Sequence, residues 1–113
     1  MNIDKDIADA LGTMGLPIAV GMYKTKGPYP DAYIVIAPLD ERNDDIADDM
    51  PLTETAAADV NLHTRKDYRA AKDGMKALLE AAGFYLEDRR YVAYDSDTGH
   101  HHYVITVERM EIL

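Results

Sequence analysis

The chain has 113 residues, of which 47% are hydrophobic, with no cysteine and a formal net charge of −9 at pH 7. This length suits one domain spanning residues 1–113, and the lack of cysteine excludes disulfides and thiolate metal sites. Because Lys and Arg supply most of the affinity for phosphates, an acidic chain is poorly suited to nucleic acid or to anionic membranes. No apolar run reaches the ~20 residues that span a bilayer, and the acidic start is unlike a secretory signal. We therefore expect a cytoplasmic protein whose partners are proteins.

The first fourteen residues carry apolar side chains at helical spacing: Ile3, Ile7, Leu11 and Met14. This spacing predicts a short amphipathic helix that packs on the core, with a protein-binding helix as the alternative. The glycines at positions 12 and 15 and the proline at 17 predict that the helix ends there. Residues 18–23 and 32–37 are apolar and β-branched, which predicts two strands, and the loop between them suggests an antiparallel pair.

Residues 38–54 are rich in Asp and Glu, which predicts a mobile acidic loop or arm because like charges resist compaction. An arm that becomes ordered on meeting a neighbouring protein is the functional alternative. The residues expected to contact a partner are Asp40, Glu41, Asp44, Asp45, Ile46, Asp48, Asp49 and Met50. Asp40, Asp44 and Asp48 are four apart, but the calcium-loop pattern and its glycine are missing, so we do not favour a calcium site.

Residues 55–64 alternate between apolar and polar side chains in their second half, which predicts a half-buried strand. His63 falls on the polar side of this strand, so we expect a solvated imidazole. Thr64, followed three residues later by Asp67, predicts a helix start. The next apolar residues lie at helical spacing, and Gly83 is a natural left-handed cap; they are Tyr68, Ala71, Met75, Leu78, Leu79 and Ala82.

The last third of the chain predicts a β-hairpin, with strands at 89–94 and 101–112 and a turn at 95–99. Together these elements give the order α–β–β–β–α–β–β. We therefore expect an α+β fold, with a mostly antiparallel sheet of about five strands and two helices.

Three consecutive histidines follow the turn. In a strand, His100 and His102 share one face and His101 lies on the other. A metal needs three or four converging ligands, so the triplet alone cannot hold one. Asp95, Asp97 and His63 could assist, but no spacing requires it. We interpret the histidines as polar side chains that open a strand, and a metal site stays open as the alternative.

No catalytic motif stands out in this sequence. It has no G-x-S-x-G elbow, no H-E-x-x-H pair and no phosphate-binding glycine loop. Carboxylates on a solvated loop share one environment, whereas a catalytic pair needs two different pKa values. Arg89 and Arg90 lie near tyrosines, but a nucleic-acid groove needs more positive charge. We expect neither an enzyme nor a cofactor-binding protein.

Several segments in their order resemble the tail terminator proteins of long-tailed bacteriophages and prophages, which complete the tail and join it to the head. The matching segments are LGTMGLPIAVGMY (11–23), YIVI (33–36), DVNLHTRKDY (59–68), ALLEAAGF (77–84) and YDSDTGHHHYVITVE (94–108). The resemblance implies a structural virion protein, present in the bacterial cytoplasm during assembly and then in the virion tail.

The same resemblance implies that the protein forms a ring, as a hexamer, that caps the tail tube and stops its growth. Its partners would be other copies of itself, the tail-tube protein and the head-connector protein, with no nucleic acid and no membrane. The acidic charge is consistent with a ring through which DNA passes without binding. The alternative is a small monomeric adaptor or regulatory domain that docks one protein partner through its acidic loop.

Overall fold

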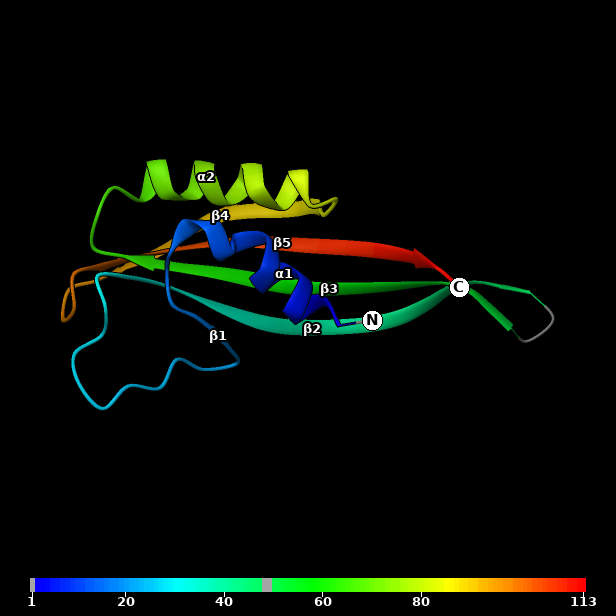
Figure 1. Cartoon of the computed structure of the whole chain (residues 1–113), viewed down its shortest axis with the longest axis horizontal. Coiled ribbons are helices and arrows are strands. Elements are labelled where there is room, and N and C mark those ends of the chain that lie inside the picture. The colour runs from blue at the N-terminus through cyan, green and yellow to red at the C-terminus, as the bar shows by residue number, and fades with distance from the viewer. Residues whose placement is uncertain (1, 48–49) are drawn as a thin grey trace.

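The computed structural model describes residues 2–47 and 50–113, and it forms two layers (Figure 1). One layer is a five-stranded sheet, and the other consists of two helices on one face of that sheet. The helices are α1 (Ile3–Leu11), extended by the 3₁₀ turn η1 (Gly12–Met14), and α2 (Tyr68–Ala81); the strands are β1 (Ile18–Val20), β2 (Ala32–Ala47), β3 (Met50–Thr64), β4 (Tyr85–Asp95) and β5 (His100–Ile112). The expected α+β fold and the order of its elements are confirmed.

The strands lie in the order β1-β2-β3-β5-β4, and all neighbours are antiparallel except β1 and β2. The antiparallel pairing expected for residues 18–23 and 32–37 is therefore wrong. Residues 21–31 carry the chain back to the end of the sheet where β1 begins, so that Ile18 pairs with Ile34 and Val20 with Ile36. A tight hairpin turn would have reversed the direction instead.

The core lies between the helices and one face of the sheet. Ile7 and Leu11 of α1, and Met75 and Leu79 of α2, are fully buried against strand residues such as Ile36. Burying each such side chain stabilises the fold by about 1.5–3 kcal/mol. The helical faces expected from the sequence are thus confirmed. Within residues 2–47 and 50–113, no helix combines the length and the hydropathy that crossing a bilayer requires.

The start of α2 differs from the expectation. Thr64 is the last residue of β3, and the N-cap is Asp67, whose Oδ1 accepts a hydrogen bond from the Arg69 N–H at 3.0 Å. Thr64 instead accepts a hydrogen bond from the Lys66 N–H at 3.1 Å. Gly83 follows the helix with φ +92°, the left-handed conformation expected of it.

The acidic segment is a paired hairpin rather than an irregular loop. β2 and β3 stay in antiparallel register from Ala32 opposite Thr64 to Ala47 opposite Met50, with one bulge after Pro38. The hydrogen bonds between strands join backbone atoms, and the side chains of neighbours such as Asp40 and Glu41 point to opposite faces, which separates their carboxylates. With the end of β5 the hairpin forms a projection, here called the arm (residues 38–47, 50–55 and 109–112), at the end marked C in Figure 1. The molecule is 54 Å long and only 27 × 24 Å across.

Candidate interaction surface

The arm exposes more large apolar side chains than any other part of the molecule described by the structure. Ile112 is 80% exposed and Met50 is 65% exposed. Among the described side chains, the large apolar ones exposed on or beside the arm are Leu39, Met50, Leu52, Met110, Ile112 and Leu113. Single exposed apolar residues are ordinary, whereas several gathered at one end of a small domain make that end a candidate contact surface.

Two ion pairs lie at the base of the arm, where it meets the part of the sheet that the helices cover. Arg109 of β5 donates a hydrogen bond to Asp6 of α1, and its guanidinium lies 5.2 Å from the centre of the Phe84 ring. Hydrogen bonding from Arg109 holds the pKa of Asp6 below its usual value. Arg42 of β2 lies 3.6 Å from a carboxylate oxygen of Glu108 on β5. The Arg109 contact joins β5 to α1, whereas the Arg42 contact joins β2 to β5.

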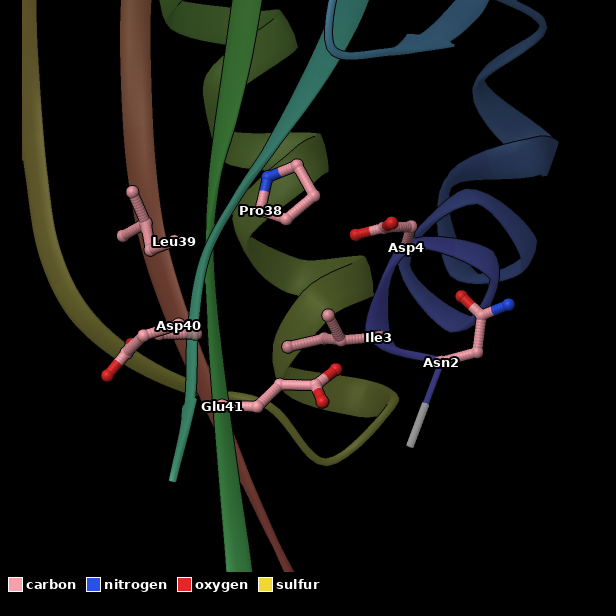
Figure 2. Close-up of a pocket in the computed structure, with 8 residues that line it drawn as sticks. Asn2, Ile3, Asp4, Pro38, Leu39, Asp40 and Glu41 are labelled. Carbon is pink, nitrogen blue, oxygen red and sulfur yellow. The ribbon is translucent and has the colours of Figure 1, made fainter.

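A groove lies where the arm meets α1 (Figure 2). It has a volume of about 640 Å³. Figure 2 shows Pro38 and Glu41 of β2 pointing toward α1, whereas Leu39 and Asp40 point away from it. The carboxylates of Asp4 and Glu41 form the acidic part of the lining. The groove is therefore open and negatively charged, which suits a basic side chain better than an anion.

Of the residues expected to contact a partner, those that the structure describes lie on β2 and β3, and Asp40 and Glu41 lie on opposite faces. Asp40 pairs with Ala57 and Glu41 with Ala56, so their side chains point to opposite sides of β2. Met50 begins β3 and is exposed. The backbones of Asp44, Asp45 and Ile46 belong to β2. Asp48 and Asp49 lie outside the described residues.

The histidine triplet alternates as expected. His100 and His102 lie on the face of the sheet away from the helices, here called the open face. His101 lies on the helix side, beside Tyr68, and its Nδ1 is 2.9 Å from the Tyr91 hydroxyl. Within the described ranges, no group of three or more His, Asp or Glu side chains is arranged to hold a metal ion.

His63 departs from the expectation of a solvated imidazole. Its ring is stacked between Tyr33, with ring centres 4.7 Å apart, and His102, at 4.3 Å. Burial lowers the pKa of His63 to about 4, and repulsion from His102 and His100 adds to this effect. The imidazole is therefore neutral at pH 7. The sequence placed His63 on the correct face, but it did not show that Tyr33 and His102 flank it, because that depends on the register of three strands.

Hydrogen bonds between strands order the rest of the open face. The side-chain N–H of Asn61 donates a hydrogen bond to the Val35 carbonyl at 3.1 Å. The side-chain oxygen of Asn61 lies 2.8 Å from Nε2 of His102. Thr106 donates to Asp59 at 2.6 Å. Sequence reasoning missed this network. The polar residues of 59–63 and 100–106 were the available signal, but only the pairing of β3 with β5 makes them partners.

Comparisons with known proteins add no family to these observations. The chain matches no protein-family model, and a search of curated proteins gives no match. The arm, the groove at its base and the open face are therefore the grounds on which a function can be argued.

Proposed function

We propose that this chain is a structural protein of a long-tailed phage or prophage, which caps the tail tube and joins the tail to the head as a ring of identical subunits. The observation that carries the proposal is the arm, which projects from the helix-covered body and exposes apolar side chains at its end. The resemblance of segments 11–23, 59–68 and 94–108 to tail terminator proteins supplies the biological setting.

The arm supports assembly because its apolar side chains have nothing in the body to pack against. Ile112 and Met110 lie on the open face of the arm, where β5 pairs with Thr53 and Thr55 of β3. Covering such side chains yields about 25 cal/mol for each Å² removed from water. A second subunit can cover them, and a contact between different surfaces of identical subunits closes into a ring when the rotation allows.

The edges of the sheet support the same proposal. β1 covers β2 only from Ile34 to Ile36, and beyond that point no described strand pairs with the outer side of β2. At the opposite edge, β4 is a long strand that exposes Tyr85, Tyr91 and Tyr94. Open edges of this length tend to pair with other chains, and a closed ring covers them in a defined way.

Light scattering after size-exclusion chromatography tests the proposal, with the chain alone and with the tail-tube protein encoded nearest to its gene. The expected result is a closed oligomer in at least one of the two samples. Ile112→Lys should reduce the oligomer to monomers, because it places a charge in the contact. Met22→Lys is the matched control, because Met22 is 67% exposed and lies outside the arm.

A chain that stays monomeric in both samples contradicts the proposal. A stable complex of one chain with one partner molecule would instead favour the monomeric adaptor. An oligomer that Ile112→Lys and Met22→Lys weaken equally would show that the arm is not the contact surface.

A further inference from the structure

A second pocket lies at the end of the sheet opposite the arm, on the open face. Its volume is about 260 Å³. The lining residues that matter for its chemistry are Tyr33, His63, His102, Ala93, His100 and Asp95. They come from β2, β3, β4 and β5, so the strand pairing itself assembles the pocket.

A row of stacked rings crosses the sheet at this pocket and ends at an alanine. The register places Tyr33 opposite His63, His63 opposite His102, and His102 opposite Ala93. The first three rings stack in turn, with centres 4.7 and 4.3 Å apart. Ala93 puts a methyl group where the next ring of the row would lie. The pocket therefore has room for one more flat group beside His102, above Ala93.

Most polar groups around the pocket already have partners. The Nε2–H of His100 donates to the Pro30 carbonyl at 2.8 Å, and the Thr98 hydroxyl lies 2.8 Å from its Nδ1. Because both ring nitrogens are occupied and the side chain is only 3% exposed, His100 acts as a fixed wall. The sequence predicted polar side chains at the start of a strand for all three histidines. It did not show that His100 is buried more deeply than His101 and His102.

The remaining charged group of the pocket is the carboxylate of Asp95. It accepts a hydrogen bond from the Asp97 N–H at 2.9 Å, and the hydroxyl and backbone N–H of Thr98 also hydrogen-bond to it. These bonds, that from Asp97 first, keep the pKa of Asp95 below its usual value, so the carboxylate keeps its charge and has acceptor positions left for a ligand. The two nearby cations have partners of their own. Arg65 pairs with Asp31 at 3.0 Å, and Arg90 pairs with Asp88 at 2.7 Å. The pocket thus offers ring faces and a negative charge, which disfavours an anionic ligand.

We propose that this pocket binds the guanidinium group of an arginine side chain from a partner protein. A guanidinium is flat, always charged and able to stack on aromatic rings while it donates N–H groups to a carboxylate. It would stack on His102 above Ala93 and donate to Asp95. Lysine lacks the flat face, so it is the poorer ligand. The site is separate from the arm and does not depend on the function proposed above.

Binding can be measured on the full chain labelled with ¹³C at alanine methyl groups, because Ala93 is then a direct reporter. The probes are arginine capped as N-acetyl N-methylamide, the equivalent capped lysine, and free arginine. The expected result is a saturable shift of the Ala93 methyl signal with capped arginine, with about tenfold weaker binding of capped lysine. Free arginine should bind about as well as capped arginine.

Matched variants locate the site. Asp95→Asn should weaken capped arginine about tenfold, whereas Asp97→Asn removes the same charge two residues away and should change little. Ala93→Leu should abolish binding by filling the slot, measured by titration calorimetry because the Ala93 reporter is then absent. Ala81→Leu, at an exposed alanine on the far side of the molecule, should not abolish it.

Three results would overturn the assignment. The first is equal binding of capped arginine and capped lysine, or equal losses in Asp95→Asn and Asp97→Asn, since either means attraction to net charge alone. The second is an Ala93 methyl signal that capped arginine does not shift. The third is free arginine that binds tenfold more tightly than capped arginine, since the ligand would then be a small molecule rather than a side chain.

Discussion

Asn61 and His102 are joined across two strands by a hydrogen bond of 2.8 Å, and the same Asn61 side chain donates to the Val35 carbonyl on a third strand. Because the amide oxygen of Asn61 faces the ring, the Nε2 of His102 carries the proton. One amide therefore links β2, β3 and β5 and sets the tautomer of a histidine in the stacked row.

Replacing Asn61 tests how much these two hydrogen bonds contribute to the free energy of unfolding. Asn61→Ala leaves the proton on His102 without its partner in a half-buried position, and we expect a loss of about 1–3 kcal/mol in the free energy of unfolding. Asn43→Ala is the control at an exposed asparagine in the arm, with an expected change below about 0.5 kcal/mol. Urea unfolding measures both, and equal losses would contradict the assigned role.

The stacked histidines make stability depend on pH. The pKa of His63 is about 4 in the fold and ordinarily 6.5, and burial also lowers the pKa of His102. The unfolded chain therefore binds protons more readily between pH 6.5 and 4, so that stability falls as pH falls through this window. The decrease due to His63 should be roughly 1–3 kcal/mol at the acid end.

His63→Phe checks this dependence, because it keeps a flat ring but cannot take up a proton. Urea unfolding between pH 7 and 4.5 should show a shallower loss of stability for His63→Phe than for the unchanged chain. His101→Phe is the control on the opposite face. A pH dependence that His63→Phe leaves unchanged would mean that other groups cause it.

The contact between Asp6 and Arg109 should matter more than an ordinary surface pair. Arg109→Met removes both the bond to Asp6 and the contact with the Phe84 ring, and we expect the melting temperature to fall by a few degrees. Lys5→Met removes the exposed pair with Asp9, 3.1 Å apart, and should change the melting temperature much less. Calorimetric melting compares the two, and equal effects would contradict a special role for Arg109.

Two glycines around α2 should respond to alanine in opposite directions. Gly74 lies inside the helix, and a Cβ there would meet no atom within 4 Å, so Gly74→Ala should stabilise the fold by about 0.5–1 kcal/mol. Gly83 has φ +92°, which side chains disfavour, so Gly83→Ala should destabilise it by about 1 kcal/mol. Urea unfolding gives the sign of each change, and two changes of the same sign would be the contrary result.

The sequence predicted the elements of this fold better than their connections. Helical spacing located both helices, because Ile7, Leu11, Met75 and Leu79 repeat with the helical period. Runs of apolar β-branched residues, alternation and the turn at 95–99 located the five strands. Local patterns did not show that β1 joins β2 in parallel, since this depends on the path of residues 21–31. They also favoured a loop at 38–54, because a dense run of acidic residues suggests disorder. In the structure, β3 pairs with β5 as well as with β2, and such pairing lets strands continue through charged residues.

For the candidate sites too, local patterns in the sequence predicted single residues but not the contacts between residues far apart in the chain. Alternation placed His100 and His102 on one face, and composition drew attention to Asp40 and Glu41. Neither could show that Tyr33 and His63 continue the histidine row, nor that Ala93 ends it. Those relations join residues far apart in the chain, and the register of the sheet decides them.

The pairing of β3 with β5 joins two segments that lie far apart in the sequence. β2 and β3 pair up to Ala47 opposite Met50, which are three positions apart, so this pair can form early from residues that are close in the sequence. β5 joins β3 across the intervening helix and strand, and Arg109 meets Asp6, 103 positions away. Contacts between such distant residues slow folding, so we expect β5 to join after β2 and β3 have paired. A chain cut short before β5 would leave β3 without its second neighbour and expose the longest edge in the molecule to other chains.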